Sequence, residues 1–283
     1  MSVEDASTQS DGYHFNDGTT SGHALETDRD TWEYQYDQNG NLIHDANKEI
    51  DISYNHLNLP VVVDFGDGNR LEWVYDAGGK KLRKSVYENY IVVSSRDYAN
   101  GFEYKTVGST MALDFITTET GRAVFDGTQY FDYIYDLKDH LGNVRLSFKA
   151  NSQGNPVIMQ QDHYYPFGMR LAGLSETYGS DNKYLYNGKE LEDYNDLHWY
   201  HYGARYYDPQ LGRWMQVDPA DEFYSPYVYC ANNPINFVDP DGATVVFADD
   251  GSNDFEYVFD GLGFDIFALA SDYVVNFPNF IPL

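Results

Sequence analysis

A short unit recurs along this chain and restricts it to a β-rich fold: an alternating aromatic strand, a Tyr-Asp or Tyr-Asn pair, and a turn. In the first copy, Trp32, Tyr34 and Tyr36 alternate with polar residues, the period of two expected for a strand with one buried face. Asn39-Gly40 follows, a pair favoured in tight hairpin turns because both residues tolerate positive φ. The Asp after each Tyr is predicted to cap its turn by accepting backbone N–H bonds. The copies contain Tyr36, Tyr54, Tyr75, Tyr135, Tyr186 and Tyr207.

A single hairpin of this kind is marginally stable in water, so neighbouring hairpins have to cover its aromatic face. Hairpins laid edge to edge make one long antiparallel sheet that curves. The 27 Tyr and 17 Phe suit half-buried pleated surfaces, and disordered chains and coiled coils avoid aromatic residues at this density. We therefore predict an all-β fold built on a curved repeat sheet, with an ordinary β-sandwich of similar hairpins as the alternative.

Charge and motifs exclude several classes of function. A net charge of −27 argues against a nucleic-acid partner, because nucleic-acid surfaces need clustered Lys and Arg. Cys230 is the only cysteine, so no internal disulfide forms. We find no phosphate-binding loop, nucleophile elbow or metal-ligand spacing, and predict neither a cofactor nor a metal. No apolar run approaches the roughly 18 residues of a membrane span, so no membrane span is predicted.

The stretch from residue 135 to residue 242 carries a specific resemblance. Its ordered blocks include the segment YGARYYDPQLGRW and two Asp-Pro pairs, Asp218-Pro219 and Asp239-Pro240. This stretch resembles the RHS repeat-associated core, in the form common in Bacteroidetes-type bacteria, and residues 32–86 resemble the YD repeats that precede that core. The blocks are residues 138–145, 163–168, 186–191, 202–214, 218–219, 227–234 and 239–242.

The resemblance implies a domain organisation. Family members wind a spiralling antiparallel sheet into a hollow shell, close it with the core as a plug, and carry a variable C-terminal toxin. We expect a flexible leader over 1–30, a YD-repeat sheet over 31–131, the RHS core over 132–242, and a variable tail over 243–283. The leader has neither the basic nor the apolar region of a signal peptide. About six repeats make only a partial shell, so this chain would be a fragment, an orphan module or a partial wall.

The resemblance also implies a function. The leading hypothesis is a shell and plug segment that encapsulates or presents a C-terminal polypeptide, in a polymorphic toxin of bacterial competition or an insecticidal toxin complex. Its partners would be the toxin or cargo polypeptide, an immunity protein or the secretion machinery, and its location secreted or cell-surface. A surface adhesin is the alternative from another class, because exposed aromatic residues with carboxylates stack on sugars.

Some family members cleave themselves with a pair of aspartates, which gives a second hypothesis. Two carboxylates in one site separate their pKa values, so that one serves as base and the other as acid toward a peptide bond. The matching positions are Asp218 and Asp239, with Asp208 and Arg213 nearby in sequence, and the cleaved bond would lie just beyond Gly242, near Ala243. The chain departs from the family pattern after each Asp-Pro pair: Ala220-Asp221 follows the first, where a Gly is favoured, and Ala243 follows the second, where a Leu is usual. The alternative is that both Asp-Pro pairs only close turns.

The last segments carry weaker signals. Residues 243–283 contain no Lys, Arg, His or Cys, so a truncated or inactive toxin start fits better than an active one. The alternation of Val245 and Phe247 predicts a strand. Ser225-Pro226 matches a helix start, which predicts a short helix that buries Cys230.

Overall fold

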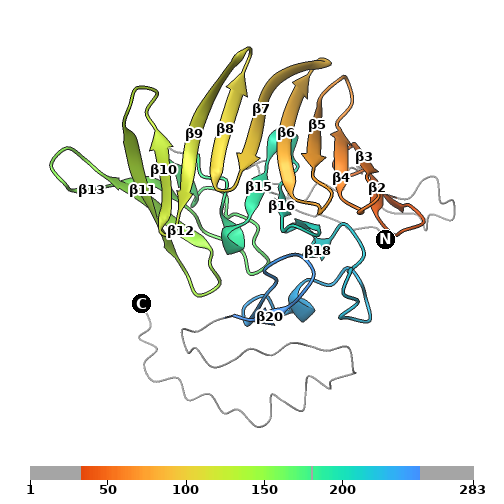
Figure 1. The fold of residues 1–283 in the computed structure, drawn as a ribbon. Coiled ribbons are helices and arrows are strands. Elements are labelled where there is room, and N and C mark those ends of the chain that lie inside the picture. The colour runs from red at the N-terminus through yellow and green to blue at the C-terminus, as the bar shows by residue number, and fades with distance from the viewer. Residues whose placement is uncertain (1–32, 180, 249–283) are drawn as a thin grey trace, which may run out of the picture.

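The computed structural model describes residues 33–179 and 181–248, and almost every regular element in it is a β-strand (Figure 1). The predicted leader over 1–30 and the tail beyond residue 248 lie outside the described residues. No helix in the described ranges is long and apolar enough to cross a membrane.

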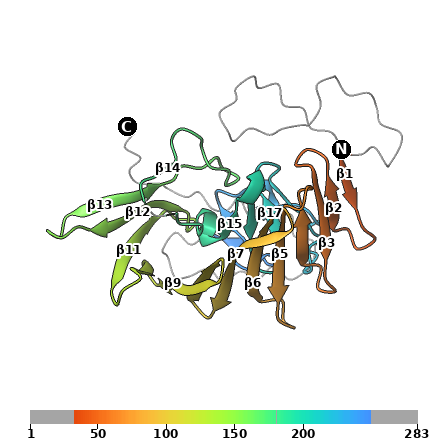
Figure 2. The same cartoon turned by 90° about the horizontal axis from the view of Figure 1, so that it is seen from above.

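Fourteen strands form one antiparallel sheet in which each strand pairs with the next along the chain. We call this sheet the wall. It is open, since β1 and β14 are its two edges, and in Figure 2 its strands follow an arc. The all-β, curved-sheet prediction is confirmed, and the sheet crosses the predicted boundary between residues 131 and 132. The strands are β1 (Tyr34–Tyr36), β2 (Leu42–Asp45), β3 (Ile50–Tyr54), β4 (Pro60–Asp64), β5 (Arg70–Tyr75), β6 (Lys81–Glu88), β7 (Ile91–Ala99), β8 (Phe102–Val107), β9 (Thr110–Thr118), β10 (Gly121–Phe125), β11 (Phe131–Lys138), β12 (Val144–Ala150), β13 (Pro156–Gln161) and β14 (Glu176–Thr177).

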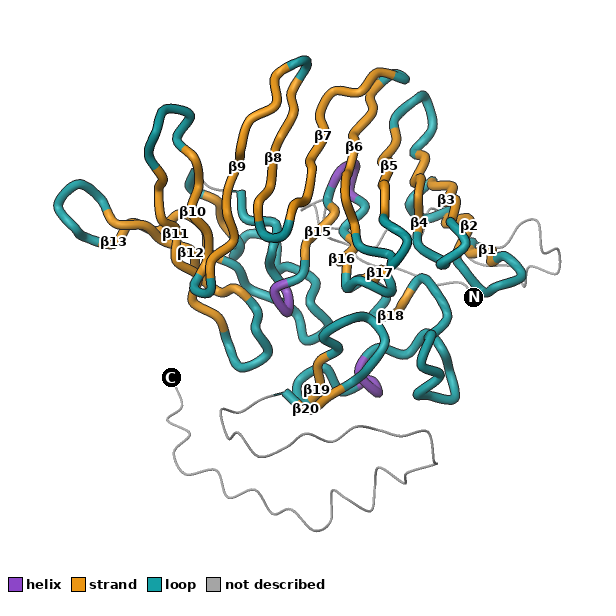
Figure 3. Tube along the Cα trace, in the orientation of Figure 1, coloured by secondary structure: helices purple, strands orange, loops and turns teal. Residues whose placement is uncertain are grey.

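The chain then turns inward and builds a second body, residues 182–248, which we call the plug. Its strands β15 and β17 lie on the inner side of the arc (Figure 2). Loops occupy most of its length (Figure 3). Its regular elements are a four-stranded sheet of β15 (Glu190–Glu192), β16 (Trp199–His201), β17 (Tyr206–Asp208) and β18 (Arg213–Trp214), the pair β19 (Phe237–Val238) and β20 (Val246–Phe247), and three 3-10 turns, η2 (Tyr186–Gly188), η3 (Tyr194–Asp196) and η4 (Cys230–Asn232).

The small plug sheet is buried on both faces, which places it between two cores. Trp199 and Tyr206 pack against wall residues such as Trp73, whereas Tyr200 and Tyr207 face a second cluster inside the plug. Successive residues of a strand point to opposite faces, so the pairs Trp199-Tyr200 and Tyr206-Tyr207 each serve both cores. All four side chains are at most 1% exposed. Burial of apolar surface in the first cluster therefore holds the plug on the wall.

The hairpin turns use the predicted Asp caps with a different backbone. Asp37 Oδ1 accepts bonds from the backbone N–H groups of Asn39 (2.8 Å) and Asn41 (2.9 Å). Gly40 has a positive φ (79°), whereas Asn39 does not. The expected tight turn with positive φ at both residues is therefore wrong. The Gly40 N–H donates to the Asp37 carbonyl (3.1 Å), as in a type I turn closed by a left-handed glycine.

The same turn recurs at Gly79 and Gly142. At Gly142 the capping residue is not the Asp that follows the Tyr. At Gly142 the cap is Asp139, whose Oδ1 accepts from Leu141 N (3.0 Å) and Asn143 N (3.1 Å). Asp136, the Asp after Tyr135, instead bonds Ser147 Oγ of the next strand (2.5 Å). The rule that the Asp after the Tyr caps the turn is thus wrong for this looser copy.

A buried ion network joins the wall to the plug. Lys81 and Lys84 of β6 each contact Glu190 and Glu192 of β15, at N–O distances of 2.6 to 3.0 Å. Tyr98 of β7 donates its hydroxyl to Glu190 (2.7 Å). The two carboxylates are almost fully buried, so each depends on these partners for its charge.

The helix expected after Ser225-Pro226 is wrong. Only the 3-10 turn η4 forms, beginning at Cys230. The chain is held extended before it, because Trp214 N donates to the Tyr227 carbonyl (3.1 Å) and Arg213 forms a β-bridge with Val228. Cys230 is fully buried, as expected. The predicted strand at Val245 and Phe247 forms as β20, although only Phe247 lies within it.

Candidate functional site

Three buried charged side chains meet inside the plug. Arg205 Nη2 lies 3.4 Å from Asp218 Oδ1 and 3.3 Å from Asp239 Oδ2. Both carboxylates and the guanidinium are at most 5% exposed. One cation thus neutralises one of two anions, and the low local dielectric strengthens the remaining interactions. The structure therefore brings together the two predicted aspartates, with an arginine that the sequence did not single out.

Separate segments position this cluster. Arg205 directly precedes β17, Asp218 follows β18, and Asp239 follows β19. The guanidinium stacks 4.2 Å from the centre of the Trp214 ring, which fixes its plane. The Ala204 N–H donates to the Asp241 carbonyl (2.9 Å), so the loop before β17 is tied to the second Asp-Pro turn.

Asp239 closes the turn that contains the predicted scissile bond. Its Oδ1 accepts backbone N–H bonds from Asp241 (3.2 Å), Gly242 (2.6 Å) and Ala243 (3.2 Å). Burial raises the pKa of Asp239 to about 6, against the lowering effect of Arg205 and of the bonds from Gly242 and Asp241. This carboxyl group therefore exchanges its proton near neutral pH, as a general acid does.

The Gly242–Ala243 peptide is held at both ends. Arg205 donates Nε–H to the Gly242 carbonyl oxygen, and the Ala243 N–H donates to Asp239 (3.2 Å) and to Asp241 (2.9 Å). A cationic donor on the carbonyl favours the negative charge that develops there when the carbon is attacked. The amide nitrogen must gain a proton when the C–N bond breaks, and a carboxyl group beside that nitrogen can supply it.

A third carboxyl, Glu222, lies at the same turn. Its Oε2 accepts the Val245 N–H (2.9 Å). Burial and the nearby charges of Asp218 and Asp239 raise its pKa to about 7, opposed by Val245 and Arg205. Ionisable side chains therefore hydrogen-bond the backbone on both sides of the Gly242–Ala243 bond.

The other two predicted site residues have different partners. Asp208 caps the turn after β17 by accepting from Gln210 N (2.8 Å), and it bonds Trp199 Nε1 (3.1 Å) and pairs with Lys48 (3.2 Å). Arg213 Nη1 donates to Asn232 Oδ1 (2.9 Å) and to the carbonyl of Gly212. The structure thus does not join either residue to the Arg205 cluster.

The sequence pattern did not distinguish Arg205 from Arg213. Both lie in the same block, flanking the strand β17, and both precede an aromatic residue. The signal that was available is the consecutive pair Tyr206-Tyr207: aromatic residues at adjacent strand positions indicate a strand buried on both faces, so a charged residue just before the pair also lies inside the fold. A charged side chain in such a position needs partners, and the Asp-Pro pairs are the candidates.

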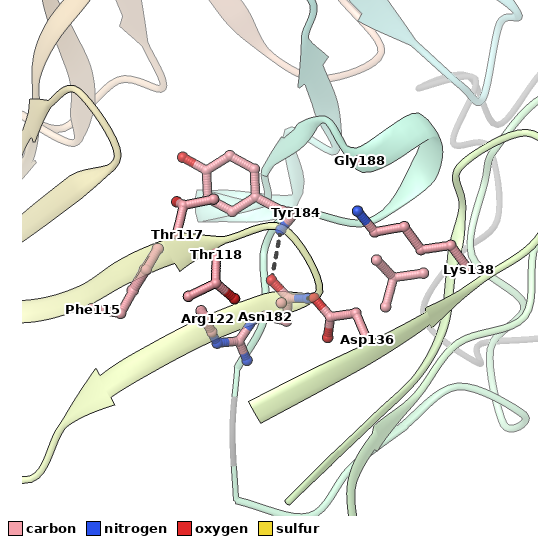
Figure 4. Close-up of a pocket in the computed structure, with 11 residues that line it drawn as sticks. Phe115, Thr117, Thr118, Arg122, Asp136, Lys138, Asn182, Tyr184 and Gly188 are labelled. Carbon is pink, nitrogen blue, oxygen red and sulfur yellow. Dashed lines mark hydrogen bonds between the residues drawn. The ribbon is translucent and has the colours of Figure 1, made fainter. Parts of the chain in front are cut away.

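A polar cavity lies elsewhere, on the seam between wall and plug. It opens between β9 to β11 and the plug segment from Asn182 to Gly188, and its volume is about 90 Å³ (Figure 4). Burial lowers the pKa of Arg122 there, and Asn182 Oδ1 accepts from Tyr184 N (3.0 Å), drawn as the dashed line. Ligand pockets usually measure about 300 to 1,000 Å³, so this space suits a few waters. Within residues 33–179 and 181–248, no three His, Cys, Asp or Glu side chains are arranged to hold a metal ion.

The chain matches no family model, but it is similar in sequence to several known proteins. Salivary gland surface protein 1 of Aedes aegypti is 30% identical over 232 residues, which are 75% of this chain and 7% of that protein. Toxin subunit YenC1 of Yersinia entomophaga is 28% identical over 65% of this chain and 20% of its own length. The tRNA nuclease WapA of Bacillus subtilis is 26% identical over 73% of this chain and 9% of its own length.

Solved structures share the fold. The Photorhabdus luminescens Tc holotoxin pore covers 76% of this chain with a TM-score of 0.61 at 22% identity. A crystal structure of TcdB2-TccC3 covers 73% with a TM-score of 0.60 at 23% identity. The chain spans 11% of either matched chain. Its homologues thus include Tc toxin subunits and WapA nucleases, proteins of the RHS/YD-repeat toxin family, and it spans only a small part of each.

Proposed function

We propose that this chain is a shell and plug segment of an RHS-type toxin protein of the Bacteroidetes form, and that it encapsulates or presents the polypeptide that follows the plug. The observation that carries the proposal is the plug on the inner side of a curved wall, held by buried aromatic residues and by the Lys81, Lys84, Glu190 and Glu192 network. The homologous toxin subunits support a secreted or cell-surface location. An immunity protein or the secretion machinery would be its further partners.

The plug is suited to hold a following polypeptide at a fixed point. Asp239 and Arg205 bind the backbone at Gly242, and Glu222 binds it at Val245, which is 1% exposed. The bonds of Asp239 and Arg205 are made inside a buried cluster, where a hydrogen bond to a charged group contributes about 1.5 to 3 kcal/mol. The chain therefore leaves the plug from an anchored turn.

Native proteolysis by chymotrypsin with mass spectrometry tests this role. We expect residues 33–248 to resist as one body, and we expect cuts inside 182–248 to be at least about tenfold faster when Glu190→Lys repels Lys81 and Lys84. Arg83→Glu is the matched control, because Arg83 is half exposed and pairs only with Asp97 in the described structure. If the unmodified plug is cut as fast as a denatured chain, it is not held by the wall and the proposal fails. Cutting of the bonds beyond residue 248 separates the two forms of the role, since an encapsulated polypeptide is protected and a presented one is not.

Self-cleavage is the second candidate, favoured by the arrangement around the Gly242–Ala243 peptide. Asp218 would take a proton from a water molecule, and the water oxygen would attack the Gly242 carbonyl carbon. Arg205 would stabilise the oxyanion, and protonated Asp239 would give its proton to the Ala243 nitrogen as the C–N bond breaks. The turn-closing bonds of Asp239 are equally those of a purely structural Asp-Pro turn, and activity decides between the two.

Intact mass measured over days at about pH 6 tests this candidate. Cleavage predicts loss of the 32.4 kDa species and a new fragment that ends at Gly242. Asp239→Asn should abolish the fragment, and Asp208→Asn, a buried aspartate that caps a different turn, should leave it. An unchanged mass under these conditions excludes self-cleavage. The adhesin alternative is tested separately: an array of glycans to which the chain does not bind would exclude it.

A further inference from the structure

The two halves of the wall differ in the residues that they turn toward the solvent. In β3 and β5 the apolar residues Ile52 and Trp73 face the plug, and the alternate positions, such as Glu72, face outward. In β8 and β11 charged residues are among those that face the plug. Glu103 bonds Tyr184, and Asp136 contacts Asn182. Because side chains alternate along a strand, the positions beside Glu103 and Asp136 point away from the plug, and Phe102, Tyr135 and Leu137 occupy them. Phe115 and Ile134 are apolar residues of this half that do face the plug side.

The pairing register gathers these outward residues into one surface. Phe102 is opposite Ile116, Ile116 is opposite Ala123, and Ala123 is opposite Tyr133, which makes a row across β8 to β11. A second row crosses from Tyr135 through Phe148 to Ile158. We call this surface, the outward side of β8 to β13, the outer face.

No outward position of β8 to β12 that is paired in register carries a charged side chain. Arg145, at the bulge of β12, is a charged residue beside this surface, where it contacts His163 (3.1 Å). Tyr133 is 57% exposed, Leu137 54%, Ile158 45% and Phe102 42%. A chain in which 22% of residues are charged would not leave the paired outward positions of five adjacent strands free of charge by composition alone. Contiguous exposed apolar surface of this kind marks an interaction site.

We infer that the outer face binds the outer face of a second copy of this chain. Each copy carries a net charge of −27, so two copies repel wherever charged surfaces approach. The outer face is a surface where contact buries aromatic residues and brings no carboxylates together. A different protein that binds this acidic chain through charge complementarity would be basic, and it would bind where carboxylates lie. The outer face carries no such carboxylates.

The dimensions fit such a pairing. Six strands about 4.8 Å apart and about seven residues long at about 3.3 Å per residue cover roughly 600 Å² of flat area. A standard interface buries about 800 Å² of accessible surface per partner, and side-chain relief makes accessible area larger than flat area. Two such faces stack about 10 Å apart, as in a β-sandwich, and a two-fold axis makes the contact self-complementary.

Sedimentation equilibrium on the full chain tests the inference. We expect a dimer whose dissociation constant falls at least about tenfold between about 50 mM and 500 mM NaCl, because salt screens the repulsion. Tyr133→Glu with Leu137→Glu should raise that constant at least about 100-fold. Tyr224→Glu with Ile235→Glu is the matched control: it adds the same charge at exposed plug positions and should leave the dimer intact.

Near-ultraviolet circular dichroism checks that the variants keep the packed aromatic plug. If the glutamate pair unfolds the chain, Tyr133→Ser with Leu137→Ser should still weaken the dimer about tenfold. A monomer at about 100 µM in high salt overturns the inference, and so does equal dissociation by the control pair. A monomer in which the rings of Tyr133 and Tyr135 resist hydroxyl-radical labelling would show that another segment covers the face, which also overturns the inference.

Discussion

The substitution Glu190→Gln separates the contribution of the ion network from that of the apolar seam. Glu190 accepts bonds from Lys81 (2.6 Å), Lys84 (2.9 Å) and Tyr98 (2.7 Å), and its exposure is 4%. Glutamine keeps the shape of the side chain and removes the charge. Two buried lysines would then share Glu192 alone.

The expected loss follows from the cost of an uncompensated buried charge. Removing one partner of a buried pair destabilises a protein by about 3 to 5 kcal/mol. Lys84 is 15% exposed at its side chain, so water recovers part of this loss, and we expect about 3 kcal/mol. Urea denaturation monitored by tryptophan fluorescence measures it, because Trp73 and Trp199 lie in the seam. The exposed pair Arg83–Asp97 provides the comparison: Arg83→Met should cost less than about 1 kcal/mol.

The pH dependence gives an independent check. The neighbouring lysines hold the pKa of Glu190 well below its usual range, although burial opposes them. A carboxyl group whose pKa is lowered by folding stabilises the protein at pH values above its unfolded-state pKa of about 4.3. That stabilisation is lost as pH falls through the folded-state pKa. The loss of stability in acid should therefore be smaller in Glu190→Gln than in the parent. A cost below about 1 kcal/mol together with unchanged acid sensitivity would refute the argument.

Three further predictions concern the seam and the Asp239 turn. Trp73→Ala should lower the free energy of unfolding by about 3 to 5 kcal/mol in urea melts, because it empties the centre of the wall–plug core; a loss under about 1 kcal/mol would mean that the seam is loosely packed. Gly242→Ala should lower the melting temperature, because Gly242 has φ of 80° and a Cβ would meet Arg205 N at 2.9 Å, whereas Gly154→Ala meets nothing within 4 Å and isolates the cost of positive φ alone. The pKa of Asp239 is raised to about 6, so this carboxyl contributes stability that is complete below its unfolded pKa and is lost as pH rises toward 6. Asp239→Asn should therefore flatten this part of the curve of unfolding free energy against pH by up to about 3 kcal/mol. Parallel curves for the variant and the parent would contradict the raised pKa.

Much of the local structure was predictable because it depends on neighbours in sequence. The alternation of Trp73 and Tyr75 with polar residues predicted a strand with a buried face. The Asp76 cap and Gly79 predicted the turn that follows. Such features need only the period of two, the left-handed freedom of glycine and the reach of a short carboxylate. The segment after Ser225 failed because bonds from Trp214 outweighed its local preference for a helix.

The candidate site was predictable only in part. The Asp-Pro pairs indicated Asp218 and Asp239, but Asp208 and Arg213 were added on nearness in sequence. Arg205 joined the aspartates because three loops converge inside the plug. Nearness along the chain carries no information on which side chain turns inward when loops from separate strands meet.

The sequence alone therefore determined that this chain forms aromatic hairpins, because the period of side chains along a strand is a local property. Only the tertiary structure decided which face of each strand meets the plug. From β8 to β11, charged residues such as Glu103 and Asp136 face the plug, and aromatic residues such as Tyr133 face the solvent. The alternation is identical in both halves, and the face that is buried depends on where the returning chain packs.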